Sequence, residues 1–154
     1  MAYTLIEQYS RDIDWYFIDR NDRLVHVASA GGRLPKSIEP MDEIINTVHA
    51  EILDLPAIGD YNLNPNIDQI IGFESQELRT FYLSDFIEMA KRGLISIDKT
   101  ILGNFEDPQY HLVAWPKDES SLALFFPRFE SLIKVSKLLS TEIHVSFDLF
   151  QIFQ

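Results

Sequence analysis

The sequence predicts an α+β domain in which about three helices pack on a mostly antiparallel sheet. Three patterns predict it: two hairpin-like apolar runs near the start, helical apolar spacing in the middle, and strand-like alternation towards the end. These helices and strands do not repeat as regular βαβ units, which disfavours a parallel α/β fold. The chain has 154 residues and no linker-like stretch, so we expect residues 1–154 to form a single domain.

Two strands joined by a tight turn are expected first. Apolar runs flank the polar connection Asp19–Arg23, as they do in a β-hairpin. Alternation along the second run places His26 on the same face as Leu24 and Ala28. The segment Ser29–Gly32 is expected to end this strand. It is not expected to bind an anion, because it belongs to neither a phosphate loop nor a dinucleotide fingerprint.

A helix is predicted over residues 38–54. Its apolar residues recur at spacings of three and four, namely Met41, Ile44, Ile45, Val48 and Ile52. Ser37 is the expected N-cap, Pro40 is tolerated in the first turn, and Pro56 prevents continuation. Carboxylates occupy much of the remaining surface, so we expect the solvent-facing side of this helix to be acidic.

Residues 57–76 are rich in residue types that favour loops, so a loop is predicted there. Alternating Asp and Asn residues there begin like a calcium-binding loop, namely Asp60, Asn62, Asn64, Asn66 and Asp68. The match fails where Pro65 replaces the required glycine and where Ile71 replaces the bidentate glutamate. We therefore expect a structural loop at this position and no calcium site.

A second helix is predicted around Leu83–Ala90, with Ser84 or Asp85 as its cap. Two strands should follow it, over Leu94–Ile97 and Gln109–Trp115. A turn containing glycine, asparagine and proline separates them, so we expect these strands to be joined by a loop.

The C-terminal part is predicted to contain two further strands and a third helix. A short apolar strand near Leu122–Phe125 precedes a helix that begins at Pro127. The buried stripe of this helix is expected to consist of Phe129, Leu132, Ile133 and Leu139. Alternating apolar residues over 143–149 predict a closing strand.

Composition excludes several functional classes. The absence of cysteine excludes thiol catalysis, disulfide frameworks and thiolate metal sites, and it fits a reducing compartment. No apolar run approaches the ~18 residues of a membrane span, and the first residues lack signal-peptide features, so we expect a cytoplasmic protein without membrane association. The net charge of -11 disfavours nucleic acid as a ligand.

The acidic charge is concentrated in one stretch of the chain. Between Lys36 and Arg79 there is no lysine or arginine, whereas nine aspartates and glutamates fall there. Such a segment attracts basic ligands and raises their association rate. Our first hypothesis is therefore a non-catalytic module that binds a basic protein partner. The residues expected to bind it are Glu39, Asp42, Glu43, Glu51 and Asp54. The alternative is a solvated acidic surface that only keeps the protein soluble.

The sequence nominates no catalytic residue. His26, His49, His111 and His144 are the only imidazoles, and none belongs to a metal-binding motif, so we expect no metal and no cofactor. The second hypothesis is a small enzyme or ligand-binding domain with a pocket at the rim of the sheet. His111 or His49 would then be its acid–base group.

Three segments resemble a group of small uncharacterised bacterial cytosolic proteins. These segments are Asp14–Asp19, Met89–Leu94 and Tyr110–Pro116. Some members of that group are similar to immunity proteins of polymorphic toxin systems. The resemblance implies a cytoplasmic protein that binds and inhibits a toxin. It transfers no catalytic or binding residue onto this chain, because the shared segments are structural in character.

Overall fold

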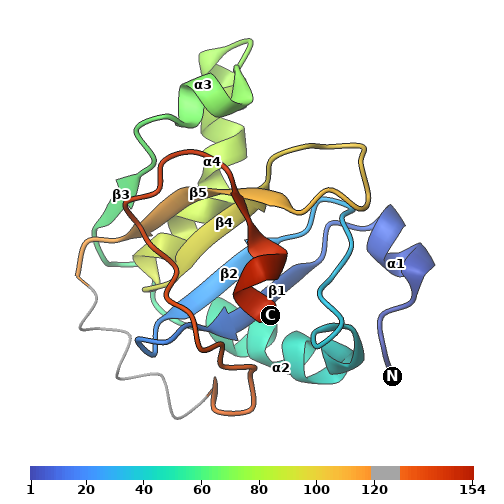
Figure 1. Ribbon diagram of the computed structural model, residues 1–154. Coiled ribbons are helices and arrows are strands. Elements are labelled where there is room, and N and C mark those ends of the chain that lie inside the picture. Colours follow the sequence, from blue (N-terminus) through green and yellow to red (C-terminus); the bar gives the residue numbers. More distant parts are fainter. Residues whose placement is uncertain (119–128) are drawn as a thin grey trace.

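The computed structural model describes residues 1–118 and 129–154, which form a mixed sheet flanked by helices (Figure 1). The strands are β1 (Asp14–Ile18), β2 (Leu24–Ala28), β3 (Tyr61–Leu63), β4 (Ile95–Lys99), β5 (Gln109–Pro116) and β6 (Phe147–Asp148). Their order is β1-β2-β4-β5-β3, and β6 pairs with β5. Every pair except β2–β4 is antiparallel. The predicted α+β class with a mostly antiparallel sheet is therefore confirmed.

Helices and the C-terminal segment cover different faces of this sheet. The helices are α1 (Leu5–Ser10), α2 (Asp42–Leu53), α3 (Ile67–Ile71) and α4 (Gln76–Lys91), with 3-10 turns η1 (Glu39–Met41) and η4 (Leu149–Phe153). In Figure 1, α4 lies behind the sheet and η4 lies in front of it. The parallel β2–β4 pair requires a long crossover, and the chain segment that contains α2, α3 and α4 supplies it.

Both predicted helices of the middle region are present, but their starts differ from the prediction. α2 follows η1 directly, and its first residue is preceded by Met41, which makes no side-chain cap; the expected cap Ser37 is therefore wrong. α4 starts seven residues before Leu83, and its N-cap is Ser75, whose hydroxyl accepts from the Leu78 amide at 3.1 Å. The expected caps inside α4 are wrong because the first turns of this helix are mostly exposed and show no apolar periodicity.

The segment predicted as a loop contains β3 and α3. β3 pairs with the last residues of β5, and Asn64 then closes the chain onto the sheet through a 2.9 Å bond from its Nδ2 to the Leu112 carbonyl. The residues Asp60–Asp68 are thus ordered by pairing with a distant strand. Local composition carries no signal for such pairing, which explains the difference.

The predicted third helix is absent from residues 129–139. Residues 133–135 instead run beside the end of β1: the Ile18 amide donates to the Ile133 carbonyl at 2.9 Å, and the Val135 amide donates to the Ile18 carbonyl at 2.8 Å. Its apolar side chains are still mostly buried, as the pattern predicted. The predicted strand near Leu122–Phe125 and the start at Pro127 lie outside the described residues.

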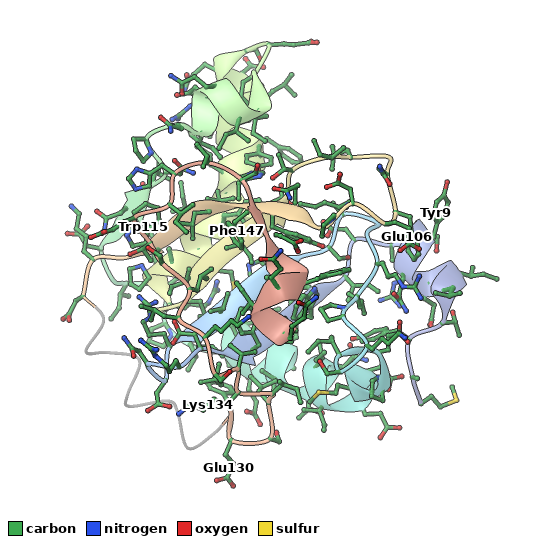
Figure 2. All side chains as sticks on the ribbon, in the orientation of Figure 1. Tyr9, Glu106, Trp115, Glu130, Lys134 and Phe147 are labelled. Atoms are coloured by element: carbon green, nitrogen blue, oxygen red, sulfur yellow. The ribbon has the colours of Figure 1, made fainter. Side chains whose placement is uncertain are left out.

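The closing strand is shorter than predicted. Only Phe147–Asp148 pairs with β5, and η4 begins at the next residue. The Asp148 side chain accepts from the Phe150 and Gln151 amides, so it caps the turn that ends the strand. Figure 2 shows Phe147 in front of the sheet and Trp115 near the outer end of β5.

One face of the sheet is apolar and the other is partly polar. The apolar face includes Trp15, Phe17, Val25 and Val27, all fully buried, and Phe153 of η4 packs on two of these side chains with ring centroids 5.6 and 5.0 Å away. The face covered by α4 carries polar side chains between its apolar contacts, among them His26, Ser96 and His111.

A buried ion pair holds the β1–β2 turn. The Asp19 carboxylate is fully buried and accepts from the Arg23 guanidinium at 2.7 and 2.9 Å. It also accepts from the backbone amides of Asn21 at 2.9 Å and Arg23 at 3.1 Å. Arg23 in turn donates to the Leu139 carbonyl, so this pair connects the turn to the C-terminal segment.

Replacing one member of this pair should leave the other charge buried and unpaired. We expect Asp19→Asn to lower the free energy of unfolding by about 3 kcal/mol or more, measured by urea denaturation. The matched control is Asp22→Asn in the same turn, whose carboxylate pairs with Lys134 at the surface and should cost less than about 1 kcal/mol. Equal losses of unfolding free energy in the two variants would contradict a stabilising role of the buried Asp19–Arg23 ion pair.

Candidate functional site

The nine carboxylates of the cation-free stretch separate into two groups. Figure 1 shows α2 at the lower edge of the molecule and α3 at its top, so the acidic residues of these helices do not share one surface. Near α3, the carboxylate of Asp68 pairs with Arg79 at 2.7 Å. The carboxylates of the stretch therefore do not form one continuous surface, and the residues expected to bind a partner are those in and next to α2.

The expected partner-binding residues differ in their availability. Glu43, Glu51 and Asp54 are exposed on α2, and within the described residues no lysine or arginine pairs with them. The Met1 amino group lies 3.2 Å from Asp42 and 3.4 Å from Glu43. Glu39 lies in η1 and is half-buried, so it contributes less to the surface.

A groove runs along this acidic face of α2. Its volume is about 310 Å³, and its lining residues are Glu43, Ile44, Thr47, Val48, Glu51 and Ser131. The carboxylates of Glu43 and Glu51 thus lie on the rim of a groove whose floor includes apolar side chains. Next to Ser131, the exposed Glu130 points away from the molecule at the lower edge of Figure 2.

The sheet face under α4 contains a Ser–His–Asp chain that sequence reasoning missed. His26 on β2 lies 2.7 Å from Asp14 on β1 through its Nε2 and 2.5 Å from Ser96 on β4 through its Nδ1. Strand register explains the grouping, because His26 is directly opposite Ser96, and Asp14 lies two residue pairs along the β1–β2 ladder and so on the same face. Since the Asp14 carboxylate can only accept, Nε2 carries the hydrogen of this bond.

This chain is not arranged for hydrolysis. In a catalytic triad the serine is bonded to Nε2 and is open to substrate, while the aspartate is buried behind Nδ1. Here the two ring nitrogens have exchanged partners, Ser96 is fully buried, and the Asp14 side chain is 40% exposed. Ser96, which holds the nucleophile position, is therefore inaccessible. The three hydrogen-bonded side chains satisfy one another's buried polar atoms.

A second hydrogen-bonded chain lies beside the first. The Tyr82 hydroxyl of α4 donates to Asp98 Oδ2 at 2.7 Å and lies 3.0 Å from His111 Nε2. Because this hydroxyl has only one proton, it accepts from His111 Nε2–H, and the Thr100 hydroxyl then donates to His111 Nδ1 at 2.8 Å. The imidazole is thus satisfied in its neutral form.

Burial shifts the pKa values of the residues in this second hydrogen-bonded network. Desolvation raises the pKa of Asp98 to about 7, against a smaller opposing effect of its hydrogen bond from Tyr82. Desolvation also lowers the pKa of His111 to about 4 and raises the pKa of the Tyr82 hydroxyl. For Asp14 the desolvation is outweighed by the hydrogen bond and charge of His26, and the pKa of Asp14 is lowered.

The histidines nominated from the sequence are positioned for structural roles. His111 is fully buried in the chain just described. His49 is half-buried on α2, and its Nδ1 lies 2.6 Å from the Tyr16 hydroxyl. The ring of His144 stacks on Trp115 at 6.0 Å. Burial leaves the His111 imidazole without access to solvent, whereas the acid–base role considered for His49 stays a prediction.

The other sequence candidates are also used structurally. In the Asp60–Asp68 segment, Asn64 Oδ1 accepts from the Asn66 amide at 2.9 Å, and its Nδ2 binds the sheet. In the segment Ser29–Gly32, the amides of Ala30 and Gly31 already donate to the Asp12 side chain and the Arg11 carbonyl. Within the described ranges, no three acidic or histidine side chains converge as a metal site requires.

A cleft of about 650 Å³ lies between residues 33–37 and the C-terminal segment. Its Arg33 and Glu106 pair with each other at 2.7 Å, so these opposite charges balance.

Searches of protein-family models, curated proteins and solved structures find no match to this chain. No helix in residues 1–118 and 129–154 is long and apolar enough to cross a bilayer. Functional inference therefore depends on the geometry of the chain itself.

Ionisation of Asp98 should make stability depend on pH. Because its folded pKa of about 7 lies above the value of 3.8 expected without the fold, the carboxyl destabilises the folded state as pH rises from about 4 to 7. Asp98→Asn cannot ionise and keeps an acceptor for Tyr82. At pH 8 we expect it to exceed the parent in free energy of unfolding by about 2–4 kcal/mol, a difference that shrinks towards pH 4.

This difference between variants isolates Asp98, since His111 affects both proteins equally. The measurement is urea denaturation across that pH range. The matched control is Asp85→Asn, an exposed aspartate of α4, whose stability should follow the parent at every pH. Parallel curves for Asp98→Asn and the parent would contradict the raised pKa.

The buried Ser96 should be unreactive in the folded protein. A fluorophosphonate probe labels accessible activated serines, and intact-mass spectrometry should detect no adduct at Ser96 because its side chain is 0% exposed. Ser96→Ala should cost about 1–2 kcal/mol of stability, since His26 Nδ1 loses its partner. A Ser96 adduct that forms in the folded parent would show that the Ser96–His26–Asp14 network activates an accessible serine.

Proposed function

We propose that this protein is a non-catalytic binding protein whose acidic helix α2 engages a basic protein partner. The observation that carries the proposal is the exposed face of α2, where Glu43, Glu51 and Asp54 have no lysine or arginine partner among the described residues. A groove of about 310 Å³ with an apolar floor lies along the same face. Charge and shape together favour a cationic protein segment over a small anion.

The energetics of such an interface follow from its exposure. Exposed carboxylates interact through high dielectric, so they accelerate encounter more than they strengthen the final complex. Ile44 and Val48 in the groove can supply the apolar contact that slows dissociation. We therefore infer an association that is fast and sensitive to salt. A toxin inhibited by this chain, as the resemblance to immunity proteins implies, would be a basic protein of this kind.

Reversing the charge on α2 should abolish retention of the partner. The test compares affinity capture from a lysate of the source organism by the parent and by the variant Glu43→Lys/Glu51→Lys/Asp54→Lys. We expect a protein of high isoelectric point to be retained by the parent, released by raised salt, and lost at least tenfold with the variant.

The matched control reverses three exposed carboxylates elsewhere, Asp60→Lys/Glu74→Lys/Glu142→Lys, which changes net charge by the same amount. This control should retain the partner. If both triple variants retain the same proteins as the parent, or both lose them equally, α2 is not the binding surface. Circular dichroism and thermal melts check that each variant is folded.

A further inference from the structure

We propose that the outer edge of β3 and the groove between β3 and α4 bind an extended segment of a partner protein, which adds to the sheet as an antiparallel strand. β3 is the last strand on its side of the sheet (Figure 1). α2 contacts β1, which lies at the opposite edge. The surface at β3 is therefore separate from the acidic face of α2, and its ligand is a further one.

The outer edge of β3 carries backbone groups without a hydrogen-bond partner. The Asp60 carbonyl and the Asn64 amide, on either side of β3, bond to β5 and the residue after it at 3.1 and 3.0 Å. Because bonded and non-bonded pairs alternate in an antiparallel ladder, Asn62 also bonds to β5. The N–H and C=O groups of Tyr61 and Leu63 therefore point away from β5. No group in the described part of the chain bonds to these four groups.

A groove with apolar walls follows the same edge on the side of α4. Its volume is about 300 Å³, and Tyr61 and Leu63 line it from β3 while Leu83 and Ile87 line it from α4. In an antiparallel pair, directly opposite residues project their side chains to the same face of the sheet. A strand added at this edge would therefore direct every second side chain into the groove while its backbone satisfies the unpaired groups of β3.

The C-terminal segment leaves this groove uncovered. It passes the other face of the sheet, where the ring of His144 stacks on Trp115 at 6.0 Å. Trp115 is opposite Asn62 in the ladder, so both side chains lie on the face away from those of Tyr61 and Leu63. Of the described residues 129–154, none lines the groove.

Charges at the two ends of the groove favour a basic residue in the added strand. Arg79 lines the end towards α3, and Asp68 already pairs with it at 2.7 Å. Glu88 lines the end at the start of β3, because the Gly59 amide bonds to the Lys91 carbonyl at 2.9 Å and holds the last turn of α4 there. Lys91 Nζ lies 4.0 Å from Glu88, too far for a hydrogen bond. The Glu88 carboxylate can therefore accept from a lysine or arginine of the partner.

Backbone pairing and the groove have different roles in such a complex. Each backbone bond replaces a bond to water, so pairing fixes the direction and register of the segment more than its affinity. Burial of two alternate apolar side chains in the groove adds affinity and selects the sequence. β-branched residues suit these positions because they favour the extended conformation. The antiparallel direction is favoured because its hydrogen bonds are perpendicular to the strands and slightly more stable.

The direct test is amide hydrogen exchange of the full chain, followed by NMR, with the blocked peptide acetyl-Thr-Val-Thr-Val-Thr-Lys-amide. In the antiparallel register its valines face Leu63 and Tyr61, and its lysine reaches Glu88. We expect saturating peptide to slow exchange of the Tyr61 and Leu63 amides about fivefold or more. The Asn62 amide already bonds to β5, so its exchange should change little.

Methylated peptides test the hydrogen bonds without any change to the protein. In an antiparallel pair the valine amides point towards β3, whereas the amides of the inner threonines point to solvent. N-methylation of both valines should therefore abolish the protection, and N-methylation of the two inner threonines should leave it in place. Equal effects of the two methylations would overturn strand addition. Loss with threonine methylation alone would overturn the antiparallel direction.

Variants of α4 test the groove. Ile87→Ala and Glu88→Gln should each weaken peptide binding about threefold, because each removes one contact of the groove with the added strand. The matched controls are Ile101→Ala, which removes a 45% exposed isoleucine outside the groove, and Glu77→Gln, which removes another carboxylate of α4. Both controls should bind as the parent does, and thermal melts check that each variant is folded.

Three results would overturn the proposal. They are no saturable protection up to about 5 mM peptide, the same weakening in the controls as in the groove variants, and protection that rises with protein concentration without peptide. The last result would show that a second copy of this chain occupies the edge of β3.

Discussion

The hydroxyl of Tyr82 joins α4 to a sheet face that would otherwise bury unsatisfied polar groups. It donates to Asp98 and lies 3.0 Å from His111, and both residues are buried. An unpaired polar group at such a depth costs several kcal/mol, so α4 is held where Tyr82 reaches both partners. The same position sets where the neighbouring residues Phe81 and Asp85 lie, and both line a cleft together with Asp12.

The parts of this arrangement that depend on local pattern could be predicted from the sequence. Alternation correctly placed His26 with Leu24 and Ala28, because a strand has only two faces. Apolar spacing found α2 to within a few residues, and its exposed carboxylates followed from the same periodicity. The sequence nominated His111 as an acid–base candidate, but α4 covers the sheet face on which it lies, and its side chain is excluded from water.

The remainder depends on contacts between distant segments, which a single sequence does not encode. Ser96 is 70 residues from His26, and Tyr82 is 29 residues from His111, so neither hydrogen-bonded chain has a local signature. The C-terminal segment shows the same limit in another way. Its apolar spacing fits a helix, yet residues 133–135 are extended because Ile18 at the end of β1 offers both a donor and an acceptor. The predicted helix and the observed segment bury largely the same side chains, but their backbone paths differ.

The two acidic surfaces differ in what their charge can achieve. On α2 the carboxylates are exposed, so water and salt screen them, and they act mainly on the rate of encounter. Beneath α4 the carboxylates border a partly buried cleft, where each interaction is stronger but a proton competes for the site. Burial holds His111 neutral, whereas the hydrogen bond and charge of His26 hold the pKa of Asp14 low. The fold therefore offsets the charge of Asp14 through His26, whereas it leaves Asp98 with a raised pKa because burial outweighs the hydrogen bond from Tyr82.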